Sequence, residues 1–311
     1  QSSCNLDFSC LSGDCPSFVT VTPGETKKVP TARAATLDAA VLPAPTPEKY
    51  DGGGAGFSMR ITGIGGTGVV TVSAVLATAA VIDGKHSRTL DMTGLAQKGG
   101  AVVSDVKIAG TPLPQAAKVA TASCDLYLCA DGLVGADQTN LKVASPERTV
   151  SVLSTAKIPT GKMVIDTRTS YPAASEVSGR IGASSRRVVA LDPMELSTQL
   201  FGDTSAANMV LVGAAYQSGA LPISAESIER AIELNGVAVD RNIQSFRRGR
   251  QAVADPAAVT AEAERLHPAP TPRALSGEER AILASVESSG NRLADILTVR
   301  VPELLAYQYL Q

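Results

Sequence analysis

The chain has 311 residues, of which 44% are hydrophobic and 19% are charged, so it can build one substantial core and a smaller appendage. Its formal net charge of −2 gives no broad attraction to phosphate backbones or anionic lipid, which disfavours nucleic-acid and membrane-surface proteins. It contains neither a secretory signal nor an apolar run of about 18 residues, which favours a soluble, cytoplasmic protein. The first residue is Gln1 and the last stretch, "LLAYQYLQ", is apolar, so we expect a piece of a longer polypeptide.

Three of the five cysteines lie close together at the start of the chain, in "CNLDFSCLSGDCPSF". The spacing of Cys4, Cys10 and Cys15, with Pro16 after the third, matches neither the paired cysteines of a zinc ribbon nor the compact run of bacterial ferredoxins. In a reducing compartment, thiolates suit a metal cluster better than disulfides. An iron–sulfur cluster, a structural zinc ion and ordinary free thiols all remain open.

Composition then divides the chain into four parts. Residues 1–20 form the cysteine-rich segment, and residues 21–55, rich in Pro, Ala, Thr and Gly, are expected to form an extended linker or strap without a core. Residues 56–254 alternate short β-type runs with helical runs. Residues 255–311 contain the proline-spaced stretch "HPAPTPRAL" and then a helical segment from Glu278, which we expect to lead into a further region.

The alternating part predicts an α/β fold, with a mostly parallel, Rossmann-like sheet and helices on both faces. A helix is expected over residues 69–84, and a long helical region from Pro193 to Arg250. Strands are expected within residues 56–64, 86–91, 99–110, 125–131, 148–155 and 186–192.

A glycine-rich turn, "GIGGTGVVT" from Gly63 to Thr71, follows the first predicted strand and opens a helix. Gly63, Gly65 and Gly68 satisfy G-x-G-x-x-G, in which glycines allow a tight turn and a close ligand approach to the helix amino end. The pattern fits NAD(P), with Asp91 as the acidic residue at the end of the second strand. It equally fits a less specific phosphate or carboxylate site, or close packing of helix on strand.

The remaining candidates have ordinary structural explanations that we favour. Cys124 and Cys129 lie in an apolar strand, where cysteine packs as a small hydrophobe, and five positions apart they would project to opposite faces. His86 and His267 have no partner motif and are expected to be solvated or locally bonded. The basic stretch "FRRGR", Phe246 to Arg250, is expected to be surface or subunit-facing rather than a phosphate site.

Three strings in order carry a family resemblance: "GIGGTGVVT", then "LDMTGLAQKGGAVVSDVKIA" from Leu90 to Ala109, and "NGVAVDRNIQSFRRGR" from Asn235 to Arg250. Together they resemble the gamma-type catalytic domain of 2-oxoacid:ferredoxin oxidoreductases, and most of all the long fused-chain indolepyruvate ferredoxin oxidoreductases. In those chains "QSSCNLDFSCLSGDCPSF" also resembles the segment ahead of this domain. The resemblance covers almost the whole chain.

The resemblance implies oxidative decarboxylation of aryl 2-oxoacids such as indolepyruvate, with coenzyme A taking the acyl group and electrons passing through iron–sulfur clusters to ferredoxin. The sequence lacks the G-D-G stretch of a thiamine diphosphate and Mg site. Those cofactors are therefore expected on partner domains of the same enzyme, and this chain is expected to be inactive alone. A homo-oligomer is also expected, without nucleic acid or membrane partners.

The site residues follow from the same resemblance. Cys4, Cys10 and Cys15 would hold a 4Fe-4S cluster whose fourth thiol lies upstream of Gln1. Backbone amides around Gly65, Gly66, Thr67 and Gly68 would contact an anion or coenzyme A. Gln97 and Lys98 are the candidate catalytic residues, as donors to a carbonyl and to a carboxylate or phosphate. Thr93 and Gly94 belong to the same matching string. An NAD(P)-dependent dehydrogenase and a non-catalytic assembly domain are the alternative functions.

Overall fold

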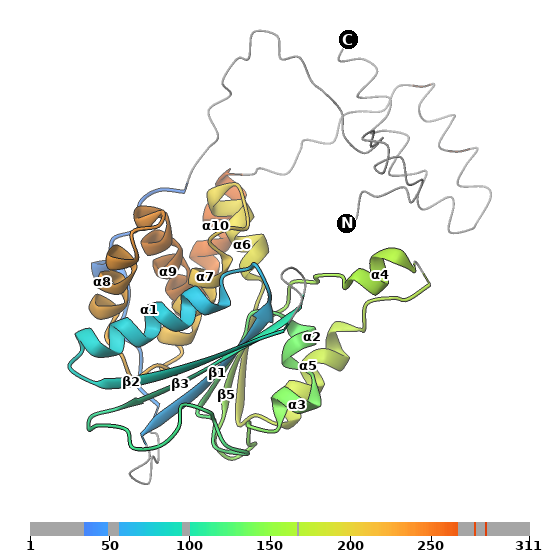
Figure 1. Cartoon of the computed structure of the whole chain (residues 1–311). Helices are drawn as coiled ribbons and strands as arrows, with labels where there is room; N and C mark the ends of the chain where they lie inside the picture. Colours follow the sequence, from blue (N-terminus) through green and yellow to red (C-terminus); the bar gives the residue numbers. More distant parts are fainter. Residues whose placement is uncertain are drawn as a thin grey trace, which may run out of the picture. The chain divides into compact units, whose positions relative to one another are not determined.

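The computed structural model describes residues 34–48, 56–94, 100–166 and 168–266, together with the single positions 277 and 284. Within these residues the molecule is a central sheet with helices on both faces (Figure 1). The α/β fold predicted from the sequence is confirmed, and each predicted strand is present. The cysteine-rich segment of residues 1–20 lies outside the described residues.

The sheet has six strands in the order β2-β3-β1-β4-β5-β6. Neighbouring pairs from β1 to β6 are parallel, whereas β3 pairs antiparallel with both β1 and β2. Only β3 therefore runs against the other strands, as expected for a mostly parallel sheet. The strands are β1 (Phe57–Ile64), β2 (His86–Thr93), β3 (Ala101–Ala109), β4 (Leu126–Cys129), β5 (Val150–Ser154) and β6 (Arg187–Leu191).

The direction of β3 follows from the length of its connection. β2 ends at Thr93 and β3 begins at Ala101, so the link is too short for the crossover of a dozen or more residues that a parallel neighbour requires. The two strands pair as a hairpin, with Thr93 opposite Val102 and His86 opposite Ala109. This hairpin lies beside β1, so β2 is not the direct neighbour of β1.

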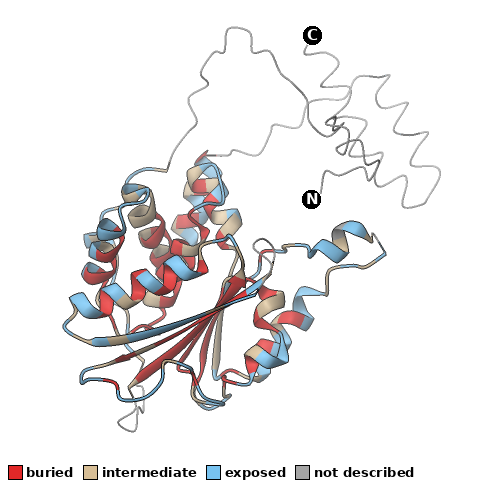
Figure 2. Ribbon diagram, viewed as in Figure 1, coloured by how far each residue is buried: buried red, intermediate tan, exposed pale blue. Residues whose placement is uncertain are grey.

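The central strands are buried on both faces (Figure 2). In β4, Leu126 and Leu128 belong to the larger core cluster on one face, while Tyr127 and Cys129 belong to the smaller cluster on the other. This alternation explains why the sequence shows a continuous apolar run there, since both sets of side chains need a covered face. The mostly parallel sheet therefore separates two cores.

Helices from different parts of the chain cover the two faces. The larger cluster is closed by α1 (Val69–Ile82), α7 (Ala207–Gln217), α8 (Ala225–Asn235) and α9 (Val239–Ala254). The smaller cluster includes residues of α3 (Gln138–Leu141) and α5 (Ala174–Ala183), beside the short α2 (Gly132–Gly135). The short α4 (Gly161–Ile165) lies between β5 and α5 in the chain. The helical region predicted from Pro193 to Arg250 is confirmed as α6 (Pro193–Phe201), α7, α8 and most of α9.

Residues 34–48, part of the predicted strap, lie along the helical layer and contain the short 3-10 helix η2 (Ala39–Val41). The arginines of "FRRGR" donate to carbonyl oxygens of this strap. Arg248 Nη2 lies 2.6 Å from the oxygen of Ala35, and Arg247 Nη1 lies 3.0 Å from that of Leu37. Arg250 Nη2 lies 3.4 Å from the oxygen of Pro43. The expectation of a solvated or subunit-facing surface is therefore wrong for Arg248 and Arg250, which are buried and bind backbone of the same chain.

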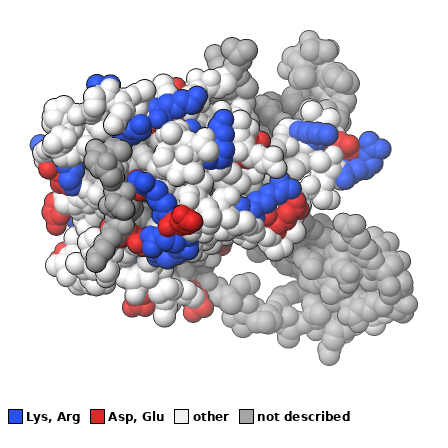
Figure 3. Space-filling model, turned by 90° about the horizontal axis from the view of Figure 1, so that it is seen from below, with Lys and Arg blue, Asp and Glu red and all other residues white. Residues whose placement is uncertain are grey.

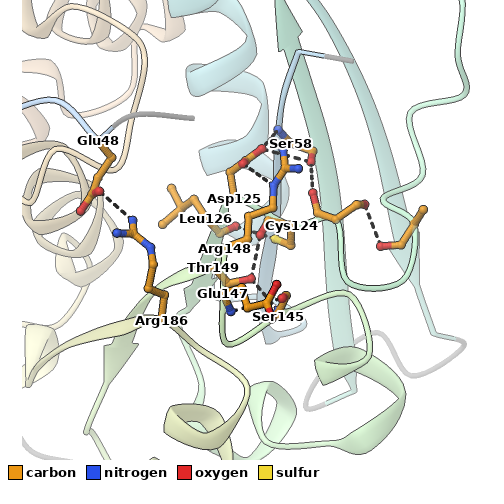
Figure 4. Close-up of polar contacts among 12 residues, drawn as sticks. Glu48, Ser58, Cys124, Asp125, Leu126, Ser145, Glu147, Arg148, Thr149 and Arg186 are labelled. Carbon is orange, nitrogen blue, oxygen red and sulfur yellow. Dashed lines mark hydrogen bonds and ion pairs between the residues drawn. The ribbon is translucent and has the colours of Figure 1, made fainter. Parts of the chain in front are cut away.

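Polar contacts fix the ends of the strap and of β1 (Figure 4). Glu48 pairs with Arg186 at 2.7 Å and with Arg187 at 2.8 Å, and the hydrogen bond from Arg186 helps to lower the pKa of Glu48. At the start of β1, Asp125 accepts from the Ser58 amide at 2.8 Å and from Arg148 Nε at 2.6 Å. Both clusters are structural ties between distant segments.

The compact unit ends at His267, beyond the boundary at residue 254 expected from the sequence. The extra helix, α10 (Pro256–Leu266), places Val259 and Leu266 in a cluster with Leu200 of α6.

The described residues contain no helix with the length and hydrophobicity of a membrane span. On the face shown in Figure 3, basic and acidic side chains are interspersed, and no broad basic patch covers it.

Candidate functional site

The glycine-rich turn connects the carboxyl end of β1 to the amino end of α1. Gly66 has φ of 87° and Gly68 has φ of 93°, both in the left-handed region that favours glycine. Space around Gly66 is open, because a Cβ there would meet no heavy atom within 4 Å. A glycine is thus required at position 66 by the backbone conformation rather than by close packing.

Gly63 has a different role in the same motif. A Cβ at Gly63 would lie 2.5 Å from Val69 Cγ2 and 3.3 Å from the Cβ of Ala130. Gly63 therefore allows α1 and the end of β4 to pack closely against β1. The packing explanation holds for this glycine, while Gly66 and Gly68 shape the turn.

The turn uses some of its backbone amides and leaves others unused. The Gly65 amide donates to the carbonyl oxygen of Gly100 at 2.7 Å, and the Thr67 amide donates to that of Ile64 at 3.2 Å. The amides of Gly66, Gly68 and Val69 have no acceptor among the described residues. Gly68 caps α1 without a side-chain hydrogen bond. Unused amides at a helix amino end attract anions.

A cavity of about 350 Å³ opens beside this turn. Ile64, Gly66 and Thr67 line it from the end of β1, and Ala130 and Asp131 line it from the end of β4. β1 and β4 are parallel neighbours, but the chain leaves them toward opposite edges of the sheet. From β1 it continues to β2, and from β4 it continues to β5. Such a switch point is where open α/β sheets bind ligands. The remaining wall consists of Ile158, Pro193, Met194, Thr204, Ser205, Ala207 and Asn208.

The wall formed by α7 is tied to the turn. Asn208 Nδ2 donates to the carbonyl oxygen of Thr67 at 2.6 Å, so the amide side chain holds the turn in place. Asn208 Nδ2 also lies 3.4 Å from a Cβ built at Gly68. The shape of the cavity therefore depends on α7 as well as on the two strands.

Asp131 is the buried carboxyl group of this cavity, with 1% of its surface exposed. Its Oδ1 accepts from the Val134 amide at 2.8 Å and caps α2, whereas Oδ2 has no hydrogen-bond partner among the described residues. Burial raises the pKa of Asp131, although backbone hydrogen bonds from Val134 and Leu133 oppose the rise. Sequence reasoning missed this residue, although an aspartate directly after a buried strand was a visible signal.

Asp91 does not lie where a dinucleotide ribose would require it. In the dinucleotide-binding arrangement, the acidic residue ends the strand next to β1, but here β3 separates β2 from β1. Asp91 Oδ1 accepts from Ser73 Oγ at 3.0 Å and from Ser104 Oγ. The sheet order therefore argues against the NAD(P) interpretation of the glycine pattern.

The structure brings part of the second matching string to the same end of the sheet. The pairing register places Thr93, Val102 and Gly63 in one row, and Gly94 follows Thr93 directly. Gln97 and Lys98 lie outside the described residues, as do Cys4, Cys10, Cys15 and His267. Their proposed roles remain predictions.

Cys124 and Cys129 pack in the core, as expected, and both are 0% exposed. Burial raises the pKa of each thiol, so neither is activated as a ligand or nucleophile. They share one cluster rather than facing opposite sides, because Cys124 precedes the strand that begins at Leu126. His86 is exposed at the start of β2, as expected.

The fold and the cavity define an α/β domain with a cavity at the switch point of its sheet. Residues 58–252 match the pyruvate ferredoxin/flavodoxin oxidoreductase family. The chain belongs to this family, and its resemblance to the gamma-type domain of 2-oxoacid:ferredoxin oxidoreductases is confirmed.

Individual relatives match a similar share of the chain. The indolepyruvate oxidoreductase subunit IorB of Archaeoglobus fulgidus is 28% identical over 195 residues, which cover 62% of this chain and 93% of that subunit. The subunit of the same name from Methanothermobacter thermautotrophicus is 24% identical, covering 64% of this chain and 98% of that subunit. The solved PORC subunit of pyruvate oxidoreductase from Thermotoga maritima is 17% identical with a TM-score of 0.44, covering 63% of this chain and 95% of that one.

Proposed function

We propose that this chain is the gamma-type part of an enzyme that oxidatively decarboxylates aryl 2-oxoacids such as indolepyruvate. In this proposal the acyl group passes to coenzyme A and the electrons pass to ferredoxin. The observation that carries it is the similarity to the indolepyruvate oxidoreductase subunit of Archaeoglobus fulgidus, which extends over 93% of that relative. The matched region, residues 58–252, includes the turn, Asp131 and the wall of the cavity.

The cofactors of decarboxylation are assigned to other domains. Among the described residues there is no group of three or more His, Cys, Asp or Glu side chains that fits a metal ion. The glycine turn offers amide donors, which suit an anion and not Mg. Thiamine diphosphate, bound with Mg on partner domains of the same enzyme, would supply the decarboxylation chemistry. Ferredoxin and a second copy of the chain are the further proposed partners.

The part played by this chain is to bind and position an anion at the edge of that active site. The unused amides of Gly66 and Gly68 are donors for a phosphate of coenzyme A or for another anion. Gln97 and Lys98 are proposed to act on the carbonyl and the carboxylate or phosphate of the reactants. Thr93 and Gly94 lie at the same end of the sheet as the turn.

Cys4, Cys10 and Cys15 are proposed to bind a 4Fe-4S cluster with a fourth thiol outside this chain. A longer chain that begins upstream of Gln1 and is purified without oxygen would contain this cluster. Changing Cys10→Ser is expected to remove its iron, because the cluster would lose a thiolate. Equal iron content in the two proteins would reject these thiols as ligands.

Reconstitution tests the function itself. The chain is mixed with separately produced thiamine diphosphate domains, and ferredoxin reduction is measured with indolepyruvate and coenzyme A. Activity is expected only when both parts are present. If the complex forms but this chain adds nothing to turnover, it is an assembly domain. If nicotinamide cofactors bind the isolated chain, the dehydrogenase alternative is favoured instead.

A further inference from the structure

Two kinds of hydrogen-bonding group at the switch point have no partner in the part of the chain that the structure describes. On the β1 side these are the amide of Gly66, which lines the cavity, and that of Gly68 two residues further along the turn; on the β4 side it is Oδ2 of Asp131, which also lines the cavity. Asp131 is the only ionisable residue among those that line the cavity in the described part of the chain, and neither Lys nor Arg lines it there. A bound anion would thus meet amide donors on one side and a carboxyl group on the other.

An ionised Asp131 is incompatible with that arrangement. A buried carboxylate without a cation is costly, and it would repel an anion held at the amino end of α1. Among the described residues, Tyr171 and Cys129 interact electrostatically with Asp131, and both are neutral acids whose pKa is raised. Neither can offset a negative charge. The neutral carboxyl group, by contrast, carries an O–H that needs an acceptor, which an anionic oxygen provides.

We propose that Asp131 binds in its protonated form to an anionic oxygen of the ligand held at the amino end of α1, so that binding takes up one proton from solution. This inference rests on the proposed use of the cavity as an anion site, and it adds a residue and a proton to that site. The ligand class is a phosphate or carboxylate. Oδ1 remains on the Val134 amide, so only Oδ2 donates.

Sulfate is a suitable probe because its charge does not change in the range in which a carboxyl group titrates. Isothermal titration calorimetry of the whole chain, in buffers with different ionisation enthalpies, measures the protons taken up per sulfate bound. Above the pKa of Asp131 we expect uptake to approach one proton and the affinity to fall about tenfold per pH unit. Sulfate binding without proton uptake overturns the inference and leaves the anion site intact.

Two substitutions identify the group that titrates. Asp131→Asn keeps a donor and a good cap for α2 but cannot take up a proton, so sulfate binding should lose its pH dependence. Asp131→Ser keeps the cap with a shorter donor and should also bind without proton uptake. The matched control is Asp137→Asn, which changes an exposed cap of α3 that accepts from the Thr139 amide at 2.8 Å. Unchanged proton uptake in Asp131→Asn would overturn the assignment.

Competition experiments distinguish a phosphate ligand from a carboxylate ligand. They also distinguish failure of the anion site from failure of the role proposed for Asp131. Displacement of sulfate by coenzyme A indicates a phosphate ligand, and displacement by phenylpyruvate indicates a carboxylate ligand. If sulfate, coenzyme A and phenylpyruvate all fail to bind the wild-type chain, the anion site itself is rejected, and the role of Asp131 with it.

Discussion

Gly66 and Gly84 have similar backbone conformations, with φ of 87° and 72°, and a Cβ at either would meet no atom within 4 Å. They lie beyond opposite ends of α1, and only Gly66 lines the cavity. This pair separates the cost of a strained backbone from the loss of a binding site.

We predict that Gly66→Val and Gly84→Val each lower the free energy of unfolding by about 1 to 2 kcal/mol, because a β-branched residue is forced into the left-handed region. Only Gly66→Val should also weaken sulfate binding, measured by calorimetry. Urea unfolding gives the stability of both variants. Equal sulfate affinity in the two variants would show that the turn does not bind the anion.

The glycines of the turn could be found from the sequence, whereas Asp131 was missed. The glycines were visible because their spacing is a known pattern, and the structure gives separate reasons for Gly63 and Gly66. Asp131 belongs to no known motif, and its only sequence signal is its position directly after a buried strand. Its proposed role depends on burial, on an Oδ2 without a partner among the described residues and on the end of β1 lying beside the end of β4, and these depend on strand order.

Among the elements, the crossing of α7 and α9 depends on two glycines. A Cβ at Gly213 would lie 2.0 Å from the carbonyl oxygen of Phe246, and one at Gly249 would lie 1.9 Å from that of Val210. Backbone meets backbone there, so neither helix can accept a side chain without moving apart from the other. The glycine of "FRRGR" is therefore a packing residue.

We predict that Gly249→Ala destabilises the protein by about 3 kcal/mol or more, because the added methyl group overlaps a backbone carbonyl that cannot rotate away. Gly179→Ala in the middle of α5 is the control, since a Cβ there meets no atom within 4 Å. It should raise stability by roughly 0.5 to 1 kcal/mol through helix propensity. Thermal or urea unfolding distinguishes the two, and a Gly249→Ala protein of normal stability would disprove the close crossing.

Asp83 links α1 to α8 through hydrogen bonds. Asp83 ends α1 and accepts from the Ser224 amide at 2.8 Å and from the Ser224 hydroxyl at 2.7 Å, with a further hydrogen bond from Ser227. Burial alone would raise the pKa of Asp83, but these hydrogen bonds lower it from 3.8 to about 2. The ionised form is therefore the one that the fold stabilises.

We predict a loss of roughly 2 kcal/mol of stability as pH falls from about 4 to about 2. The sign follows from the lowered pKa, since the contribution is complete above the pKa of the unfolded chain and disappears as Asp83 becomes protonated in the folded one. Urea unfolding at several pH values measures it, and Asp83→Asn should lack this component. An identical pH profile in both proteins would assign the effect to other carboxyl groups.

The sequence predicted where the strands and helices lie along the chain, but it did not predict the direction of every strand. Short apolar runs located β4 and β5, because burial on both faces requires such runs. β3 runs antiparallel because the connection after Thr93 is short. The alternation of strands and helices, from which the parallel sheet was predicted, takes no account of the length of a connection. That one reversal moves β2 away from β1 and removes Asp91 from the position a dinucleotide needs.

At the scale of the whole molecule, distant segments are joined through backbone contacts that composition does not reveal. None of the described strap residues, 34–48, is fully buried, and several of them are held through their amides and carbonyls. The Leu37 amide donates to Gln244 Oε1 at 2.7 Å, and the Glu48 amide donates to the oxygen of Gly219 at 3.0 Å. Such contacts are indifferent to side-chain type, so a Pro and Ala-rich sequence gives no sign of them.

Helix α10 makes two long-range contacts. Its Val259 and Leu266 cover Leu200 of α6, which is 1% exposed. Glu262 of α10 accepts from the Ala35 amide at 3.0 Å and pairs with Arg248 at 3.5 Å. Arg265 and the Ala35 amide, with other contacts, lower the pKa of Glu262 to about 2. The helix thus completes a small core and also holds the start of the strap.

We predict that a chain ending at Ala254 is less stable than one ending at His267 by at least about 2 kcal/mol, because Leu200 and its neighbours lose their apolar cover. Hydrogen exchange gives a local control: the Ala35 amide should exchange faster in the shorter chain, since its acceptor Glu262 is gone. The Glu48 amide should stay protected, because its acceptor, the carbonyl of Gly219, is retained. Equal stability and equal Ala35 exchange in the two truncated chains would place the boundary of the compact unit at residue 254 after all.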